Sequence, residues 1–433
     1  MVLTEMKIAF FVAEYYPRIV GGLGTYAVEM TRQFVEQGHD VVVFTLNRER
    51  RLLTHELWRG IFIHRPQIVD LSSVFPLFVT EDLRRWGQNL QGFCDVFSYN
   101  HLSASKFVNE LIHKEHEQFD IVAVHDWLSS IAGLIIRKEL PHMPTVFHVH
   151  STEQQRSQGL GSEVIRHFER TMAETADTVV TVSYAMKDYI TALGYPPDKI
   201  RVAWNGVDPD KYSMRTIKLE EVQALRERYS LTSDDKVILF VGRLTRIKGA
   251  ANLVQAMPQV LAAFPQARLV LLGLGEEYSD LVQLTRRLGI ADKVTFHAEF
   301  VSEHERIVHY ALSDVCIFPS ITEPFGIVSL EAMAMEKPVV VGASGVSGFK
   351  EQVIPVDPGR TGVHIDGGDP NDIAWGLKQA LSDSQRAREW GQNGLKRVRE
   401  YFTWKAAAEN TISIYQETIR THTSSTTPTT GNR

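Results

Sequence analysis

The sequence has few cysteines and no long hydrophobic run, and both absences limit what the protein can be. Only Cys94 and Cys316 occur in 433 residues. They lie far apart, so neither a disulfide framework nor a four-ligand zinc site organises the fold. No apolar stretch approaches the roughly 20 residues of a membrane span, and the first strand-like run is too short for a secretory signal. We therefore expect a protein of the reducing cytoplasm with no membrane span.

An excess of charge of one sign is also missing. The chain has 46 Lys and Arg against 52 Asp and Glu, a net charge of −6 without long like-charge runs. This balance provides no electrostatic footprint for nucleic acid or an anionic membrane. With 44% hydrophobic residues, the chain is too long for one core, so we expect two domains with a ligand between them. The sequence carries no signal of oligomeric state.

The first half of the chain alternates strand-like and helix-like segments. An apolar run at 8–12, a glycine-rich loop, a helical periodicity through Met30 and Phe34, and a second apolar run at 41–44 predict strand, helix and parallel strand. Further apolar runs follow at 121–124, 145–147, 178–182 and 200–203. This half is typical of a doubly wound α/β sheet.

The second half repeats the pattern after an irregular stretch that begins near Asn205. Apolar runs at 237–241, 268–272, 294–296, 315–318 and 339–341 alternate with helical patterns. We expect a Rossmann-like domain at 1–205, a second at 206–395, a helical segment at 396–420 that crosses back, and a disordered tail at 421–433. Two such sheets with binding loops at their strand ends would face each other across a cleft.

Gly21-Gly22-Leu23-Gly24 marks a predicted strand-to-helix turn. Glycines let a ligand approach the backbone, and the first amides of the helix attract an anion, so Gly21 and Gly22 are a candidate phosphate site. The spacing matches neither the dinucleotide fingerprint nor the Walker motif. A simple tight turn explains the glycines equally well.

Two cations, Arg243 and Lys248, follow the first strand of the second half. An arginine clamp and a lysine point charge suit a diphosphate leaving group, whose negative charge grows during bond cleavage. The alternative is a solvated loop, the usual setting of basic residues.

Two glutamates follow a later strand of the second half. Glu323 precedes a turn, and Glu331 lies about one and a half turns into the next helix. The first carboxylate can accept hydrogen bonds from sugar hydroxyls and the second from a ribose diol, while the amides near Phe325, Gly326 and Ile327 point at an anion. Glutamates at this spacing are often only helix-start caps, but their placement at a strand end of the second half makes the signal more specific.

Histidines gather at strand ends of the first half. His125 ends one strand, and His148 and His150 share one face of the next. We expect no metal, because no cysteine or carboxylate stands at ligand spacing. Hydrogen bonding to substrate hydroxyls is the preferred role, and His148 alternatively belongs to the core.

Several motifs share one order along the chain. They are Glu14-Tyr15-Tyr16-Pro17, Gly21-Gly22-Leu23, His125-Asp126-Trp127, His150, Asn205-Gly206-Val207-Asp208, Arg243, Lys248, Glu323 and Glu331. Over nearly the whole chain this series resembles the retaining glycosyltransferases of family four, which have the GT-B fold of two Rossmann-like domains. Within that family, the segments at 124–128, 341–352 and 369–375 are most similar to archaeal-type and bacterial glycogen synthases.

The resemblance implies that 1–205 is the acceptor domain and 206–395 the nucleotide-sugar-binding domain, and it implies a role for each matching residue. His150 would contact the donor glucose near the reacting carbon, and Asp126 would help order that side of the site. Arg243 and Lys248 would bind the diphosphate, Glu323 the glucose hydroxyls and Glu331 the ribose.

The resemblance also implies the reaction. We expect retaining transfer of glucose from ADP-glucose or UDP-glucose to the nonreducing end of an α-1,4-glucan, without a cofactor. Transfer to a small acceptor, as in sucrose-, sucrose-phosphate- or trehalose-type synthases, is the alternative enzyme. A noncatalytic sugar-binding protein and a nucleotide-sugar epimerase are the alternatives from other classes.

Overall fold

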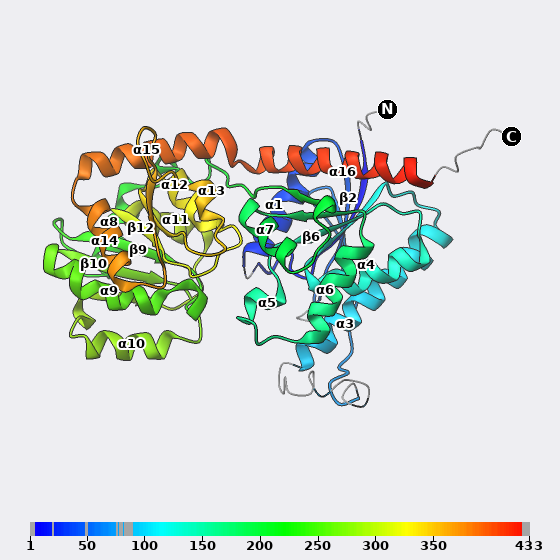
Figure 1. Ribbon diagram of the computed structural model, residues 1–433, viewed down its shortest axis with the longest axis horizontal. Coiled ribbons are helices and arrows are strands. Elements are labelled where there is room, and N and C mark those ends of the chain that lie inside the picture. Colours follow the sequence, from blue (N-terminus) through cyan, green and yellow to red (C-terminus); the bar gives the residue numbers. More distant parts are fainter. Residues whose placement is uncertain are drawn as a thin grey trace. The chain divides into compact units, whose positions relative to one another are not determined.

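The computed structural model describes residues 5–19, 21–47, 51–74, 77, 81 and 90–426. The chain forms two compact units (Figure 1). The first unit takes in the described residues of Met1–Val182, Lys187–Ala203 and Ala407–Arg433, and the second takes in Ser183–Met186 and Trp204–Ala406. Among the described residues, no helix combines the length and apolar character needed to cross a bilayer.

The first unit is built on an eight-stranded sheet in the order β3-β4-β2-β1-β5-β6-β7-β8. All neighbours are parallel except β3 and β4, which form an antiparallel pair. The strand order reverses between β1 and β5, so the loops that leave these two strands diverge at the carboxyl edge. The strands are β1 (Lys7–Phe11), β2 (Asp40–Phe44), β3 (His55–Trp58), β4 (Ile61–His64), β5 (Ile121–His125), β6 (Thr145–Val149), β7 (Thr178–Thr181) and β8 (Ile200–Val202).

Helices connect the parallel strands of this sheet. In α1, the apolar side chains of Tyr26, Ala27, Met30 and Phe34 are buried at helical spacing, and Gly38 follows with a positive φ of 86°. The helices are α1 (Gly22–Glu36), α3 (Leu90–Ser105), the π-helical η3 (Lys106–Lys114), α4 (Trp127–Glu139), α5 (Glu153–Arg156), α6 (Glu163–Thr175), α7 (Tyr184–Ala192) and the 3₁₀ turn η4 (Pro197–Lys199).

The second unit has a six-stranded, all-parallel sheet in the order β11-β10-β9-β12-β13-β14. Counted along the chain this is third, second, first, fourth, fifth, sixth, the order of dinucleotide-binding sheets, with its reversal between β9 and β12. The strands are β9 (Lys236–Val241), β10 (Ala267–Leu272), β11 (Val294–His297), β12 (Val315–Phe318), β13 (Val339–Gly342) and β14 (Gly362–Ile365).

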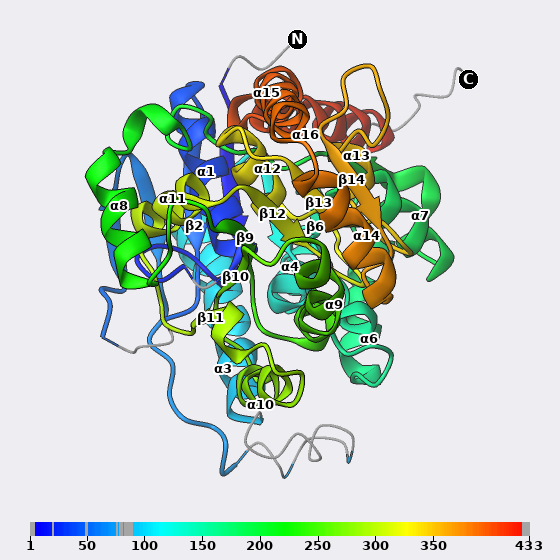
Figure 2. The same ribbon diagram turned by 90° about the vertical axis from the view of Figure 1, so that its left-hand side faces the viewer.

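Nearly all-apolar strands pack against helices in the second unit, where α9 and α14 lie side by side (Figure 2). The helices are α8 (Leu219–Arg228), α9 (Ala250–Ala263), α10 (Tyr278–Arg287), α11 (Glu303–Leu312), α12 (Ile327–Ala334), α13 (Phe349–Gln352), α14 (Pro370–Leu381) and α15 (Ser384–Tyr401), with 3₁₀ turns η5 (Met214–Thr216), η6 (Arg246–Lys248) and η7 (Ala291–Lys293). The expectation of two doubly wound α/β domains is thus confirmed, and β3, β4 and β14 are strands that the sequence did not predict.

The last helix, α16 (Trp404–Thr426), begins in the second unit and continues in the first from Ala407 onward. Buried hydrogen bonds hold it there, including Thr418 Oγ1 to Thr178 Oγ1 at 2.8 Å. Because α16 runs through Thr426, the expectation of a disordered tail from 421 was wrong for 421–426, and 427–433 lie outside the described residues.

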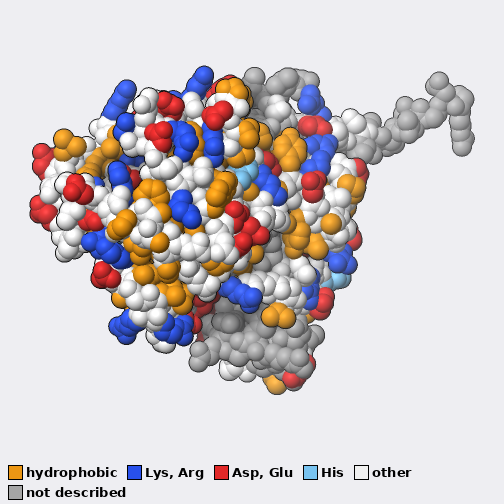
Figure 3. Space-filling model, turned by 60° about the vertical axis from the view of Figure 1, so that its left-hand side comes forward, with side chains coloured by type: hydrophobic (Ala, Val, Ile, Leu, Met, Phe, Trp, Pro, Cys, Tyr) orange, Lys and Arg blue, Asp and Glu red, His pale blue; other side chains and the backbone are white. Residues whose placement is uncertain are grey.

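Charged side chains of both signs are interspersed over the face shown in Figure 3, without a continuous basic area among its described residues. A protein that follows a phosphate backbone presents such an area. This face lacks that feature.

Candidate functional site

The carboxyl ends of β9 and β12 lie next to each other at the reversal point of the second sheet, and their loops carry two of the predicted residues. Lys248 ends η6, after β9, and Glu323 follows β12. The Lys248 Nζ lies 2.5 Å from Glu323 Oε2, which also accepts a hydrogen bond of 3.1 Å from Ser320 Oγ. Glu323 is 6% exposed. The structure therefore brings these two residues together as a largely buried ion pair at the usual ligand-binding edge of such a sheet.

Close backbone packing produces this arrangement. Gly249 has a φ of 74°, and a Cβ there would lie 2.0 Å from the carbonyl oxygen of Pro319; a Cβ at Gly367 would lie 2.3 Å from the same oxygen. Only glycine allows the loops after β9, β12 and β14 to approach so closely. Lys248 is held within reach of Glu323 as a result.

Arg243 lies in the loop directly after β9 and is exposed. Its guanidinium makes no hydrogen bond or ion pair within the part of the chain that the structure describes. Unlike Lys248, it is a cation at this edge with its donors unused. Such a group can form a bidentate contact with a phosphate without breaking a protein contact.

Glu331 lies in α12 and is only 4% exposed. Its carboxylate accepts hydrogen bonds from Tyr212 Oη at 2.9 Å, Tyr310 Oη at 2.8 Å and Arg306 Nη2 at 3.1 Å. Burial raises the pKa of both tyrosines well above their usual value, so they act as neutral donors. The predicted ribose ligand is therefore part of a buried network, and a ribose hydroxyl would have to share its oxygens with these groups.

The start of α12 carries the predicted Phe325, Gly326 and Ile327. Gly326 has a φ of 90°, and a Cβ there would lie 2.1 Å from the Phe349 ring, so the position requires glycine. Phe325 is buried, whereas Gly326 and Ile327 are partly exposed. The amides of Ile327 and Val328 donate to no acceptor among the described residues, whereas the Ser329 amide donates to the Gly326 carbonyl at 3.3 Å. Free amides at a helix start favour an anion, so the anion site at this helix end stays a prediction.

In the first unit, the glycine-rich loop precedes α1. The Gly21 amide donates to Glu14 Oε1 at 2.7 Å, and a Cβ at Gly24 would lie 2.5 Å from the same carboxylate oxygen. Glu14 therefore already places a negative charge at the amino end of α1. A phosphate at Gly21 would have to displace it, while the role of Gly22 stays a prediction.

Asp126 and His150 are in direct contact. Asp126 Oδ1 accepts a hydrogen bond of 2.7 Å from the His150 backbone amide and one of 3.3 Å from the Ser151 amide. Asp126 itself has a φ of 52° and is 4% exposed, so a strained, buried residue holds the turn after β6. The Asp126 carboxylate therefore orders the backbone at His150 through these two hydrogen bonds.

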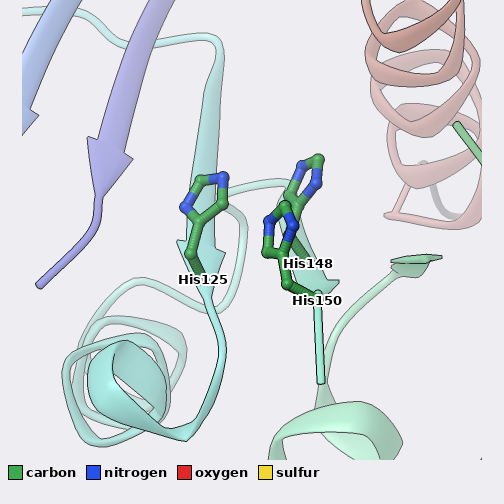
Figure 4. Close-up of side chains that lie close together, drawn as sticks. All are labelled: His125, His148 and His150. Carbon is green, nitrogen blue, oxygen red and sulfur yellow. The ribbon is translucent and has the colours of Figure 1, made fainter. Parts of the chain in front are cut away.

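His125, His148 and His150 stand together at the ends of β5 and β6 (Figure 4). One nitrogen of each lies within 4.8 Å of the others. Burial lowers the pKa of all three, with a further lowering of His125 and His148 by neighbouring imidazoles and a partial offset at His150 by Asp126. All three are therefore neutral near pH 7.

The protein already uses three of the six imidazole nitrogens in this cluster. His125 Nδ1 donates to the Phe11 carbonyl at 2.9 Å, and both nitrogens of His148 contact tyrosine hydroxyls. Only Nε2 of His125 and Nε2 of His150 are buried without a partner among the described side chains. A protein-bound zinc takes at least three ligands, so this arrangement is one ligand short unless His148 gives up a hydrogen bond.

The sequence did not reveal several residues that build these sites. They are Tyr26, Arg156, Glu169 and Tyr415 around the histidine turn, and Tyr212, Arg306 and Tyr310 around Glu331. Each lies at an ordinary helical or loop position with no motif of its own. Only a spatial arrangement could have identified them.

Two doubly wound units with polar residues at the carboxyl edges of their sheets define the class of two-Rossmann enzymes. Two protein-family sequence models match this chain. The one described as glycosyl transferases group 1 matches residues 221–397, and the one for glycosyltransferase family 4 matches residues 20–211. An uncharacterised glycosyltransferase of Methanocaldococcus jannaschii is 33% identical over 95% of this chain and 98% of its own. The protein belongs to glycosyltransferase family 4 and is a glycosyltransferase.

Further similarities cover almost the whole chain. An α-maltose-1-phosphate synthase of Mycolicibacterium smegmatis is 30% identical over 95% of this chain and 99% of its own, and a glycogen synthase of Mycobacterium tuberculosis is 25% identical over 95% and 94%. The sucrose-phosphate synthase structure from Thermosynechococcus elongatus has a TM-score of 0.77 at 24% identity, covering 96% of this chain and 100% of that one. The fold is therefore GT-B.

Proposed function

We propose that this glycosyltransferase moves glucose, with retention of configuration, from ADP-glucose or UDP-glucose to the nonreducing end of an α-1,4-glucan. In this proposal Arg243 and Lys248 bind the diphosphate, Glu323 the glucose hydroxyls and Glu331 the ribose. His150 of the first unit contacts the glucose near the carbon that reacts.

The observation that carries the proposal is the Lys248–Glu323 ion pair at the reversal point of the second sheet. The guanidinium of Arg243, which has no partner among the described residues, lies on the same edge. In a nucleotide-sugar donor, the diphosphate is bonded directly to the sugar. The ion pair offers the Lys248 cation to the diphosphate and the Glu323 carboxylate to the sugar hydroxyls. The exposed Arg243 adds a second cation, whose stabilising effect increases as negative charge develops on the departing nucleotide.

The available carboxylates support attack on the same face as the departing nucleotide. Asp126 is committed to two backbone amides, with Arg156 Nη1 at 3.7 Å, and Glu323 is bound to Lys248. A carboxylate nucleophile must be free to bond to the sugar. Departure of the nucleotide, stabilised by cations, is therefore preferred over a covalent glycosyl-enzyme intermediate.

A small phosphorylated acceptor is the second candidate. The α-maltose-1-phosphate synthase is more similar in sequence, at 30% identity, than the glycogen synthase at 25%. A sugar phosphate would in that case take the place of the glucan end, and the donor residues would be unchanged.

Donor and acceptor profiling tests both candidates. The purified protein is incubated with ADP-glucose or UDP-glucose and with glycogen, glucose 1-phosphate or no acceptor, and nucleotide release and product are measured. Chain extension of glycogen with an α-linkage supports the first candidate, and a phosphorylated disaccharide supports the second. Inverted linkages, or a changed sugar nucleotide formed without acceptor, would contradict both.

A further inference from the structure

His148 bridges two tyrosine hydroxyls from opposite ends of the chain. Its Nε2 lies 2.8 Å from Tyr415 Oη in α16, and its Nδ1 lies 3.3 Å from Tyr26 Oη in α1. His148 is 2% exposed and Tyr415 is fully buried. A neutral imidazole has one donor and one acceptor nitrogen, so the two hydroxyls complete the hydrogen bonding of His148.

The second tyrosine of this bridge touches His150. The Tyr26 and His150 rings meet edge to face, with centroids 4.3 Å apart and planes at 61°. Such edge contacts between aromatic rings have a preferred geometry, so a shift of one ring moves the other. The chain of contacts thus runs from Tyr415 through His148 and Tyr26 to the imidazole of His150.

These contacts hold a part of His150 that Asp126 does not. Asp126 fixes the backbone amide of His150, whereas the Tyr26 ring lies against its side chain. His150 Nε2 is buried without a partner among the described groups. A side chain that must present a free nitrogen to a substrate needs its orientation set by packing.

We propose that Tyr26, His148 and Tyr415 are positioning residues that set the orientation of the His150 imidazole, so that the C-terminal helix α16 takes part in building the sugar site of the first unit. The inference rests on the proposed contact of His150 with the donor glucose. Tyr415 acts only through His148 and Tyr26 and does not itself touch substrate.

The test is Tyr415→Phe, which removes one hydroxyl and keeps the ring. We expect kcat to fall by about tenfold, less than the roughly hundredfold that a 1 Å misplacement can cost, with KM for the donor little changed. Thr418→Val is the matched control, because it removes another buried α16 hydroxyl, bonded to Thr178, without touching the histidines. It should lower the melting temperature comparably and leave kcat unchanged.

A double-mutant cycle separates positioning from general stability. In a Tyr26→Leu background, which removes the ring against His150, Tyr415→Phe should have no further effect on kcat. Equal loss of kcat in Thr418→Val, or a full additional loss in the Tyr26→Leu background, would overturn the proposal.

An NMR measurement without substrate tests the positioning of His150 independently of the proposed function. The imidazole NMR signals of His150, assigned with a His150→Gln variant, should shift in Tyr415→Phe and stay in place in Thr418→Val. Unchanged His150 signals refute the positioning role. Shifted signals in a protein that releases no nucleotide from either donor would instead refute the proposed function and leave the positioning of His150 intact.

Discussion

Lys248 Nζ and Glu323 Oε2 are 2.5 Å apart, joining the loops that leave β9 and β12. A second lysine and carboxylate link the opposite ends of the same strands. The Nζ of Lys236, at the start of β9, lies 3.4 Å from Oδ1 of Asp314, just before β12. The two pairs have the same chemistry at opposite edges of one sheet. Only the pair at the carboxyl edge lies where doubly wound sheets bind ligands.

Replacing Lys248 by alanine should reduce kcat much more than it raises KM, because the negative charge on the leaving diphosphate is largest in the transition state. Loss of one such group raises a barrier by about 3 kcal/mol, or roughly a hundredfold in rate. Steady-state kinetics with varied donor measures this. Lys236→Ala is the control and should keep wild-type kcat; a Lys248→Ala enzyme that also keeps it would remove Lys248 from the mechanism.

Replacing Glu331 by glutamine should destabilise the second unit. The neutral amide removes the carboxylate charge beside the partly buried Arg306 and offers the tyrosine donors a weaker acceptor. Breaking a buried pair of this kind costs about 3 kcal/mol. Urea unfolding followed by fluorescence measures the change. Asp210→Asn, which alters an exposed ion pair with Arg399 elsewhere in the same unit, should change the free energy of unfolding by less than about 1 kcal/mol. Equal effects of both substitutions would contradict the buried network.

The stability of the first unit should fall as the pH rises toward 8. Burial raises the pKa of Glu169 to about 8, partly offset by Arg156 and the Glu153 amide. Between the ordinary glutamate pKa and 8, the folded protein keeps a proton that the unfolded chain has lost, so each increase in pH favours unfolding. Urea midpoints from pH 5 to pH 9 measure this slope.

Glu169→Gln should abolish most of that slope, since an amide does not titrate. Glu163→Gln, at an exposed position of the same helix, should leave it in place. A wild-type midpoint that is flat over this range would show that Glu169 is ionised in the folded protein.

Activity should survive EDTA. The histidine cluster has only two buried nitrogens without a partner, and the proposed mechanism neutralises the diphosphate with Arg243 and Lys248. Dialysis against EDTA, followed by assays with and without added divalent cations, checks this. Activity that disappears and returns with one particular cation would contradict a metal-free mechanism.

The alternation of apolar runs and helical periodicity was sufficient to predict the doubly wound architecture. All five strands expected in the second half are present, because a strand buried on both faces has a continuous apolar sequence. The strands that escaped prediction lack this property. The edge strand β3 carries the exposed Leu57 and its neighbour β4 the exposed Phe62, while β14 begins at Gly362 and contains a histidine.

The sequence by itself also determined which residue types stand at the strand ends, among them Lys248, Glu323 and His150, because motif and strand are adjacent in the chain. It did not decide what those residues contact. Glu331 meets Tyr212 across 119 positions and His148 meets Tyr415 across 267. Such contacts depend on how the helices pack around each sheet, and local periodicity carries no information about partners so distant in the chain. Tertiary structure alone decided that Asp126 holds the backbone of His150, that Glu14 occupies the amide of Gly21, and that Glu331 is enclosed by its own domain.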